Sequence, residues 1–186
     1  MKRTSIKPKL KKCRSCKAEF SPRCSLDKVC SVTCAIKDTR DTAAANQKKQ
    51  DGIRKELLKS RGDFIEEAQI QFNRFIRIRD IGQVCISCQK PPKKKNAGHY
   101  RGRGAAPELR FNELNVHLQC EHCNSHLSSN AIEYRINLVK KIGIEKVEWL
   151  EGPHEPAKLS IQDIKDIKKK YSALSRELEK AQLEQS

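Results

Sequence analysis

Two cysteine pairs in the second half of the chain have the spacing of a zinc site. In each pair two residues separate the thiols, and about thirty residues separate one pair from the other. A zinc ion held by four thiolates stabilises a small fold, because the free energy of metal binding is then free energy of folding. We therefore expect a structural zinc ion bound by Cys85, Cys88, Cys120 and Cys123.

A second group of cysteines lies near the N-terminus and has similar spacing. It predicts a second structural zinc ion, bound by Cys13, Cys16, Cys30 and Cys34. Cys24 is left over. This thiol either replaces one of the four ligands or stays a free, buried cysteine.

A histidine between the two C-terminal cysteine pairs suits the hydrolysis of a phosphodiester bond. His99 follows Gly98, whose small size would let a DNA backbone approach. The pKa of a histidine lies near neutral pH, so its neutral ring can accept the proton of an attacking water. We predict that His99 is the general base. A hard divalent cation, Mg²⁺ or Mn²⁺, would stabilise the charge that develops on the leaving oxygen.

Polar residues around the last cysteine pair could orient that base or bind the catalytic metal. The candidates are Asn115, His117, Asn124 and His126. A structural role explains them equally well when each is taken alone, because histidine can cap a helix and asparagine often closes a turn. His122 and His154 are not expected to take part in the chemistry.

The composition favours a nucleic-acid partner. Of the 186 residues 37% are hydrophobic and 33% are charged, and the net charge is +16. Such a chain suits a polyanion. A membrane surface is less suitable, because no basic amphipathic helix carries a broad apolar face. Nine cysteines without a secretory or transmembrane segment indicate the reducing cytoplasm. The residues expected to contact DNA phosphates near His99 are Lys93, Lys94, Lys95, Arg101, Arg103 and Arg110.

The pattern of apolar residues and breakers predicts an α+β chain. Its segments are a basic arm with a zinc knuckle (1–35), a charged helical linker (36–62), a core (63–152) and a C-terminal helix (153–186). Gly62 should end the linker, and Asp63 should cap an amphipathic helix that reaches Arg79. Asn130 should cap a later helix in a capping box with Glu133.

The C-terminal helix should begin at Ser160, with Asp163 in its first turn, and its apolar residues follow a short heptad pattern. They are Ile164, Ile167, Tyr171, Leu174, Leu178 and Ala181. This stripe is either the seam of a homodimer or packs back on the helix over Phe64–Arg79, and the sequence supports both alternatives.

The order of the candidate residues resembles the His-Asn-His endonuclease superfamily. The resemblance rests on Gly98-His99-Tyr100, on Asn115 and on Cys123-Asn124, whose ending is similar to that of endonuclease VII. It implies a ββα-metal, treble-clef-like core in which His99 is the general base. It also implies that Asn115 orients His99 and that Asn124 binds the catalytic metal. Many members have a metal-binding Asp or His where this chain has Gly98, so Asn96, His117 or His126 would have to compensate.

Longer stretches resemble the NinG/Rap family of lambdoid phage recombination endonucleases. They include Ala97–Tyr100, Leu109–Glu113 and Cys120–His126. The resemblance implies a nuclease that cuts branched DNA, namely Holliday junctions and displacement loops, during phage recombination in the cytoplasm of a bacterial host. Phage or host recombination proteins would be further partners. The alternative is a non-catalytic, zinc-dependent DNA-binding or adaptor protein, which would not need His99.

Overall fold

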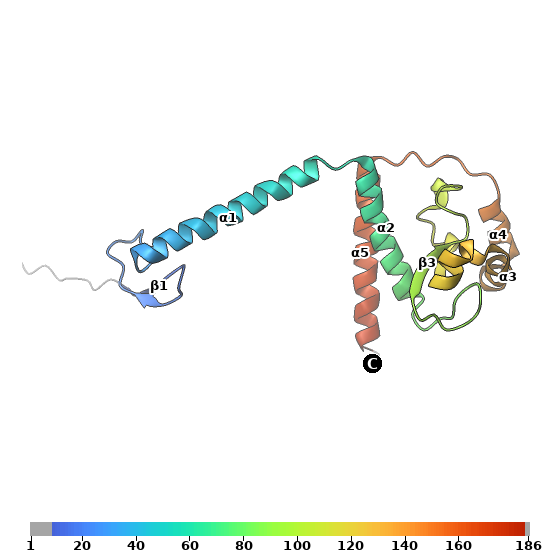
Figure 1. The fold of residues 1–186 in the computed structure, drawn as a ribbon, viewed down its shortest axis with the longest axis horizontal. Helices are drawn as coiled ribbons and strands as arrows, with labels where there is room; N and C mark the ends of the chain where they lie inside the picture. Colours follow the sequence, from blue (N-terminus) through green and yellow to red (C-terminus); the bar gives the residue numbers. More distant parts are fainter. Residues whose placement is uncertain (1–8, 185–186) are drawn as a thin grey trace, which may run out of the picture. The chain divides into compact units, whose positions relative to one another are not determined.

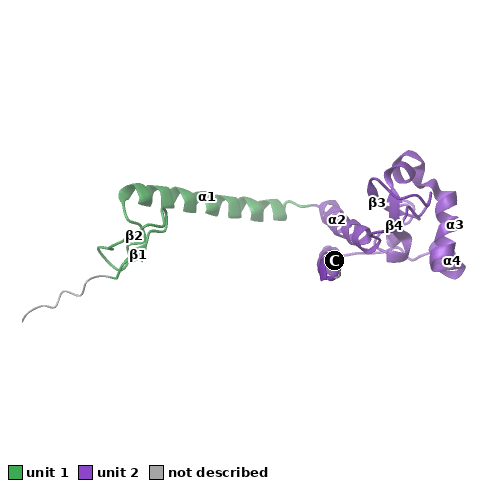
Figure 2. Cartoon of the chain, turned by 90° about the horizontal axis from the view of Figure 1, so that it is seen from below, with its two compact units in different colours: residues 1–59 green, residues 60–186 purple. Residues whose placement is uncertain are grey.

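The chain forms two units, one over residues 1–59 and the other over residues 60–186 (Figure 2). The computed structural model describes residues 9–184. The first eight residues of the predicted basic arm therefore lie outside the described residues. Residues 60–62, which we assigned to the linker, belong to the second unit.

A short β ribbon and one long helix make up the described part of the first unit. Strands β1 (Lys11–Lys12) and β2 (Glu19–Phe20) pair antiparallel, and helix α1 spans Val32–Leu57. The Ser31 hydroxyl caps α1 by accepting the backbone N–H of Cys34 at 3.2 Å. Over its whole described length α1 has no buried residue. Most of the predicted charged helical linker is therefore a solvated helix.

In the second unit, helices α2 (Arg61–Arg79) and α5 (Ile161–Glu184) lie side by side (Figure 1). The prediction that Gly62 ends the linker and that Asp63 caps α2 was wrong. Ser60 is the N-cap, and Gly62 lies inside the first turn. Ser60 and Asp63 form a capping box, in which each side chain accepts the backbone N–H of the other residue.

The apolar stripe of α5 packs on α2 within the chain. Phe72 and Tyr171 meet edge to face, with ring centroids 4.7 Å apart. Ile164 is buried against α2 as well, whereas Ala181 is exposed. Arg74 and Glu179 join the two helices by an ion pair of 2.8 Å. The structure thus shows the intramolecular packing that was one of the two alternatives for this stripe.

An antiparallel ribbon of strands β3 (Lys95–His99) and β4 (Val116–Cys120) lies beside α2. Its register pairs Gly98 with His117 and His99 with Val116. One-turn 3-10 helices at Pro107–Leu109 and Glu113–Asn115 shape the loop between the strands. After β4 the chain forms a π-helical turn over His122–His126 and a further 3-10 turn over Ser128–Asn130.

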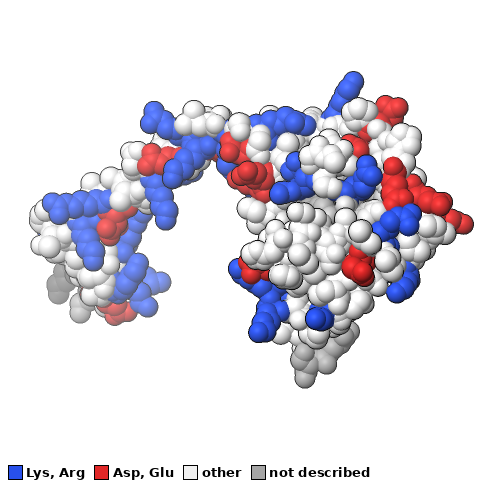
Figure 3. Space-filling view, turned by 45° about the vertical axis from the view of Figure 1, so that its right-hand side comes forward, with Lys and Arg blue, Asp and Glu red and all other residues white. Residues whose placement is uncertain are grey.

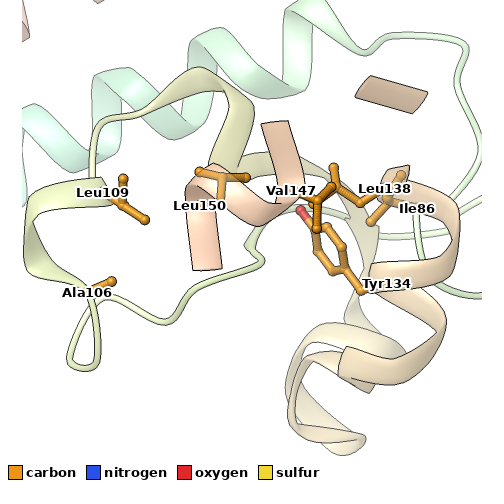
Figure 4. Close-up of a cluster of buried hydrophobic side chains, with 7 residues drawn as sticks. All are labelled: Ile86, Ala106, Leu109, Tyr134, Leu138, Val147 and Leu150. Carbon is orange, nitrogen blue, oxygen red and sulfur yellow. The ribbon is translucent and has the colours of Figure 1, made fainter. Parts of the chain in front are cut away.

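Helices α3 (Ala131–Ile142) and α4 (Ile144–Glu151) cover the other core of this unit. Ile86, Tyr134 and Leu138 are buried in it, as Figure 4 shows. The predicted capping box at Asn130 was wrong. Asn130 has a left-handed backbone, φ 43°, and its side chain makes no capping hydrogen bond. Its amide instead lies 3.8 Å from the sulfur of Cys123.

Helices joined by two short ribbons give a mixture of helix and strand, in agreement with the predicted α+β composition. Within residues 9–184, no helix has the length and apolar character that crossing a membrane would require. Lys and Arg side chains lie on the surface of both units (Figure 3).

Candidate functional site

The four C-terminal cysteines come together in the second unit as predicted. Their sulfur atoms all lie within 4.8 Å of one another, and those of Cys88 and Cys120 are 3.8 Å apart. A zinc ion with four thiolates at about 2.3 Å has sulfur–sulfur edges of about 3.8 Å. The Cys123 amide also donates to the sulfur of Cys120 at 3.4 Å, a contact that stabilises a thiolate. This quartet fits a structural zinc ion.

The N-terminal quartet also forms a cluster, in the first unit. The sulfur of Cys30 lies 3.6 Å from those of both Cys16 and Cys34, and the Cys30 amide donates to the sulfur of Cys13 at 3.4 Å. Cys24 is exposed and lies outside this cluster, with its sulfur 3.4 Å from an oxygen of Asp27. Cys24 is therefore a free thiol, but it is not the buried one that we considered.

Both quartets use the same backbone turn, which the sequence did not predict. The residue after each first cysteine pair, Lys17 or Gln89, has a left-handed φ of 65° or 55°. Its N–H donates at 2.9 Å to the carbonyl of the first cysteine, Cys13 or Cys85. The other two cysteines of each quartet flank the start of a helical segment: Cys30 and Cys120 lie just before it, and Cys34 and Cys123 lie in its first turn. The two units thus hold their sulfur ligands by one local design, a tight knuckle followed by a helix start.

His99 lies at the end of β3, and one ring nitrogen is already engaged. Its Nε2 is 3.1 Å from the carbonyl oxygen of Arg110. Because a carbonyl can only accept, Nε2 carries the proton and Nδ1 keeps its lone pair. Burial, aided by the charges of Arg103 and Arg110, lowers the pKa of His99 from 6.5 to about 4. The ring is therefore neutral at pH 7, as proton acceptance requires.

Gly98 has a different role from the one we expected. A Cβ at this position would lie 2.1 Å from Oε1 of Gln119, a fully buried side chain on β4. The absence of a side chain at Gly98 therefore makes room for Gln119 and not for a DNA backbone. The carbonyl of Gly98 accepts the hydroxyl of Tyr134 at 2.9 Å, so α3 fixes the strand next to His99.

Asn115 is completely buried and holds the loop that follows His99. Its side-chain oxygen accepts the N–H of Arg101 at 2.7 Å, and its Nδ2 donates to the carbonyls of Arg101 and Leu109. Its own carbonyl accepts the N–H of Tyr100 at 2.8 Å. Asn115 thus acts on His99 only through the neighbouring backbone.

A polar cavity of about 430 Å³ lies beside His99. Asn124, the candidate metal ligand after the last cysteine, lines it together with Arg103. The remaining lining residues are Asn73, Arg77, Asn96, Ala97, Gly102 and Ser129. Sequence reasoning missed Asn73, Arg77 and Ser129. The first two lie on α2, and only the packing of that helix on the ribbon brings them near.

The structure does not bring His117 or His126 to this cavity. His117 is buried on β4, where its Nδ1 lies 3.2 Å from the guanidinium of Arg79 and its Nε2 3.1 Å from the carbonyl of Leu114. Both ring nitrogens are therefore occupied. The exposed ring of His126 faces that of His122, with centroids 5.8 Å apart.

The basic residues that we expected near His99 do not all lie around the same cavity. Arg103 lines the cavity, and Arg110 contacts the ring of His99 through its backbone. Lys94 pairs with Glu121, and together with Lys93 it lines a separate hollow next to the cysteine cluster. Lys95 is the first residue of β3. The N–H of Arg101 is bonded to Asn115.

These features define a class: a basic protein of mixed helix and strand, with two clusters of four cysteines that could hold zinc. The sequence model of the family described as "Bacteriophage Lambda NinG protein" matches residues 5–182. The chain therefore belongs to the NinG family, as the resemblance of its motifs predicted. No solved structure matches the chain.

Relatives from several phages support this membership. The chain is 35% identical to "Protein ninG" of Escherichia phage lambda over 199 residues, an alignment that covers 96% of this chain and 98% of the relative. It is 42% identical to "Protein ninG" of Salmonella phage P22 over 127 residues, which cover 68% of this chain and 63% of the relative. For Escherichia phage 933W the identity is 41% over 133 residues, with 71% and 66% covered.

Proposed function

We propose that this chain is a structure-specific DNA endonuclease that hydrolyses phosphodiester bonds in branched DNA, with His99 as general base. The observation that carries the proposal is the placement of His99 on a polar cavity with Asn124 and Arg103. A neutral imidazole, an amide and a guanidinium around one hollow are groups that can activate a water and bind a phosphate.

The hydrogen bond to Arg110 decides which atom of His99 would act. Because Nε2 carries the proton, Nδ1 is the nitrogen that accepts a proton from water. A pKa of about 4 keeps the ring neutral but makes it a weak base. A phosphate in the cavity would raise that pKa, since a nearby negative charge favours the protonated ring. His99 would thus become a stronger base when DNA is bound.

The donor set fits a catalytic cation only in part. The side-chain oxygens of Asn124 and Asn96 are ligands that Mg²⁺ or Mn²⁺ accepts, but no carboxylate is present among the described residues that line the cavity. The DNA phosphate would have to supply the anionic oxygens. When bound, such a cation stabilises negative charge on the leaving oxygen.

The finer fold assignment belongs to this proposal. Each cysteine quartet consists of a knuckle and a helix start, and the second quartet encloses the ribbon that carries His99. This is the arrangement expected of a treble-clef-like, ββα-metal core of the His-Asn-His superfamily. Branch selectivity would come from shape and phosphate contacts, which the net charge of +16 favours.

The assembly and the setting are proposals as well. Symmetric cutting of a junction needs two active sites, and α5 is occupied by α2, so a homodimer would have to use another surface. Phage or host recombination proteins are the further partners we propose, in the cytoplasm of the infected bacterium.

The alternative is a zinc-dependent DNA-binding or adaptor protein without catalysis. The cysteine clusters and the basic surface serve that function equally well, but it would not need a neutral histidine in a cavity. To separate the two, purified protein would be incubated with a labelled four-way junction and with linear duplex of matched sequence, with Mg²⁺ or with EDTA. We expect cuts near the branch point in Mg²⁺ only. Tight binding of the junction without any cut, over a range of Mg²⁺ and Mn²⁺ concentrations, would support the alternative.

A further inference from the structure

One arginine on α2 differs from its neighbours on the same helix. Arg74 forms an ion pair of 2.8 Å with Glu179, and Arg79 forms one of 2.7 Å with Asp80. Arg77 lies between them and forms no ion pair with any described residue. It is partly buried and lines the cavity that His99 also lines. An arginine that is withdrawn from water without a carboxylate partner is costly, unless an anion completes the site.

The cavity itself has the charge of an anion site. Arg77 and Arg103 line it, and no described lining residue is acidic. Burial, together with the charge of Arg74, lowers the pKa of Arg77, and an anion in the cavity would offset both effects. Guanidinium groups bind phosphate with two parallel hydrogen bonds, so a phosphate would match Arg77 both in charge and in shape.

Asn73 lies one helical turn before Arg77 and lines the same cavity. Its side-chain oxygen accepts the Nε2 of Gln69 at 2.8 Å. This bond fixes the orientation of the amide and leaves its Nδ2 as a donor. The packing of α2 against α5 holds both residues on a rigid helix.

We propose that Arg77, with Asn73 beside it, is the phosphate-binding arm of the His99 cavity, and that it holds a DNA phosphate next to the bond that is cut. This inference rests on the proposed nuclease function, but it assigns a role to α2, which precedes the segment from Cys85 to Cys123 that carries His99. Arg77 contacts the substrate from α2, while His99 acts from β3. The two elements must therefore stay packed for cutting to occur.

The first test is independent of cutting. Inorganic phosphate would be titrated into the full, zinc-loaded chain while NMR follows the His99 ring and the side-chain amides of Asn73 and Asn124. We expect saturable shifts in the wild type and their loss in Arg77→Met, which keeps an apolar stem for packing. The matched control is Arg176→Ala, which removes the same charge from an exposed site on α5 and should leave the shifts unchanged. Equal phosphate binding by wild type and Arg77→Met would overturn the inference.

The second test uses the four-way junction. Arg77→Ala should lower kcat/KM at least tenfold, and the slope of log affinity against log salt should fall by about one. Free guanidinium, well below denaturing concentration, should restore cutting by Arg77→Ala several-fold, which a purely structural defect would not allow. A wild type that binds phosphate through Arg77 but never cuts would refute the nuclease and not the phosphate site. A wild type that cuts, with Arg77→Ala cutting equally well, would refute the role of Arg77 and leave the nuclease standing.

Discussion

Replacement of Gly98 with alanine should destabilise the ribbon that carries His99, and the structure gives the size of the effect. The new Cβ would lie 2.1 Å from Oε1 of Gln119 and 2.9 Å from its Cβ and Cδ. Gln119 is fully buried, and its Nε2 donates to the hydroxyl of Ser87 at 2.7 Å and to the carbonyl of Ser129 at 2.6 Å. The clash therefore cannot be relieved by a swing into solvent.

Two kinds of relief are available, and both cost free energy. If Gln119 moves, two buried hydrogen bonds weaken or break, at about 1–3 kcal/mol for each group left unsatisfied. If the strands move apart instead, overpacking costs about 1–3 kcal/mol. Because the protein adopts the cheaper of the two, we expect Gly98→Ala to lower the free energy of unfolding by about 1–3 kcal/mol and to displace His99 from the cavity.

Urea unfolding of the zinc-loaded protein measures this loss. Gly104→Ala is the control, because a Cβ at Gly104 meets no described atom within 4 Å, and it should change stability by less than about 0.5 kcal/mol. In a Gln119→Gly background all three clashing atoms are gone, so Gly98→Ala should then cost less than about 1 kcal/mol. Additive losses in this double-mutant cycle would refute the reasoning.

Three further predictions concern the metal centres and the histidines. Elemental analysis should find two zinc ions per chain. Cys120→Ser should unfold the second unit while the first keeps its zinc, and Cys13→Ser should unfold the first unit while the second keeps its zinc. Circular dichroism and the zinc content of each variant would show this. Burial, helped by the charges of Lys141 and Arg79, lowers the pKa of His117 from 6.5 to about 4. As the pH falls, the unfolded state therefore binds a proton at this histidine before the folded state does. His117 then contributes about 3 kcal/mol to the free energy of unfolding above pH 6.5, and this contribution is lost as the pH falls through 4. The free energy of unfolding of His117→Asn, measured as a function of pH, should lack this loss. Asn124→Ala should raise the Mg²⁺ concentration needed for half-maximal cutting, and an unchanged titration would leave Asn124 with a structural role.

The two cysteine clusters were predictable because their spacing along the chain carries the information. A Cys-x-x-Cys pair brings two sulfurs to one turn wherever it occurs, so both quartets formed as predicted. The heptad pattern of the C-terminal helix also predicted which residues pack, with the exception of the exposed Ala181, but two partners were equally compatible with it.

The remaining features depend on contacts that spacing does not encode. Gln119 reaches Gly98 across the ribbon, and Arg77 reaches the cavity from a helix that precedes the first cysteine pair. A local error had a different cause. The Ser-x-x-Asp motif was recognised at Ser160 but missed at Ser60, because Gly62 was interpreted as a helix breaker. Glycine is tolerated in a first turn whose N-cap and third residue bond reciprocally.

The measurement that tests the central claim most directly compares His99→Ala with His126→Ala on a labelled four-way junction. Loss of a general base typically costs about 10²–10⁴-fold in rate, while binding through lysines and arginines should persist. The account predicts that His99→Ala cuts at least a hundredfold more slowly and binds the junction within about twofold of the wild type. His126→Ala, whose ring does not line the cavity, should cut normally. Full cutting by His99→Ala, or its loss in His126→Ala alone, would contradict the account.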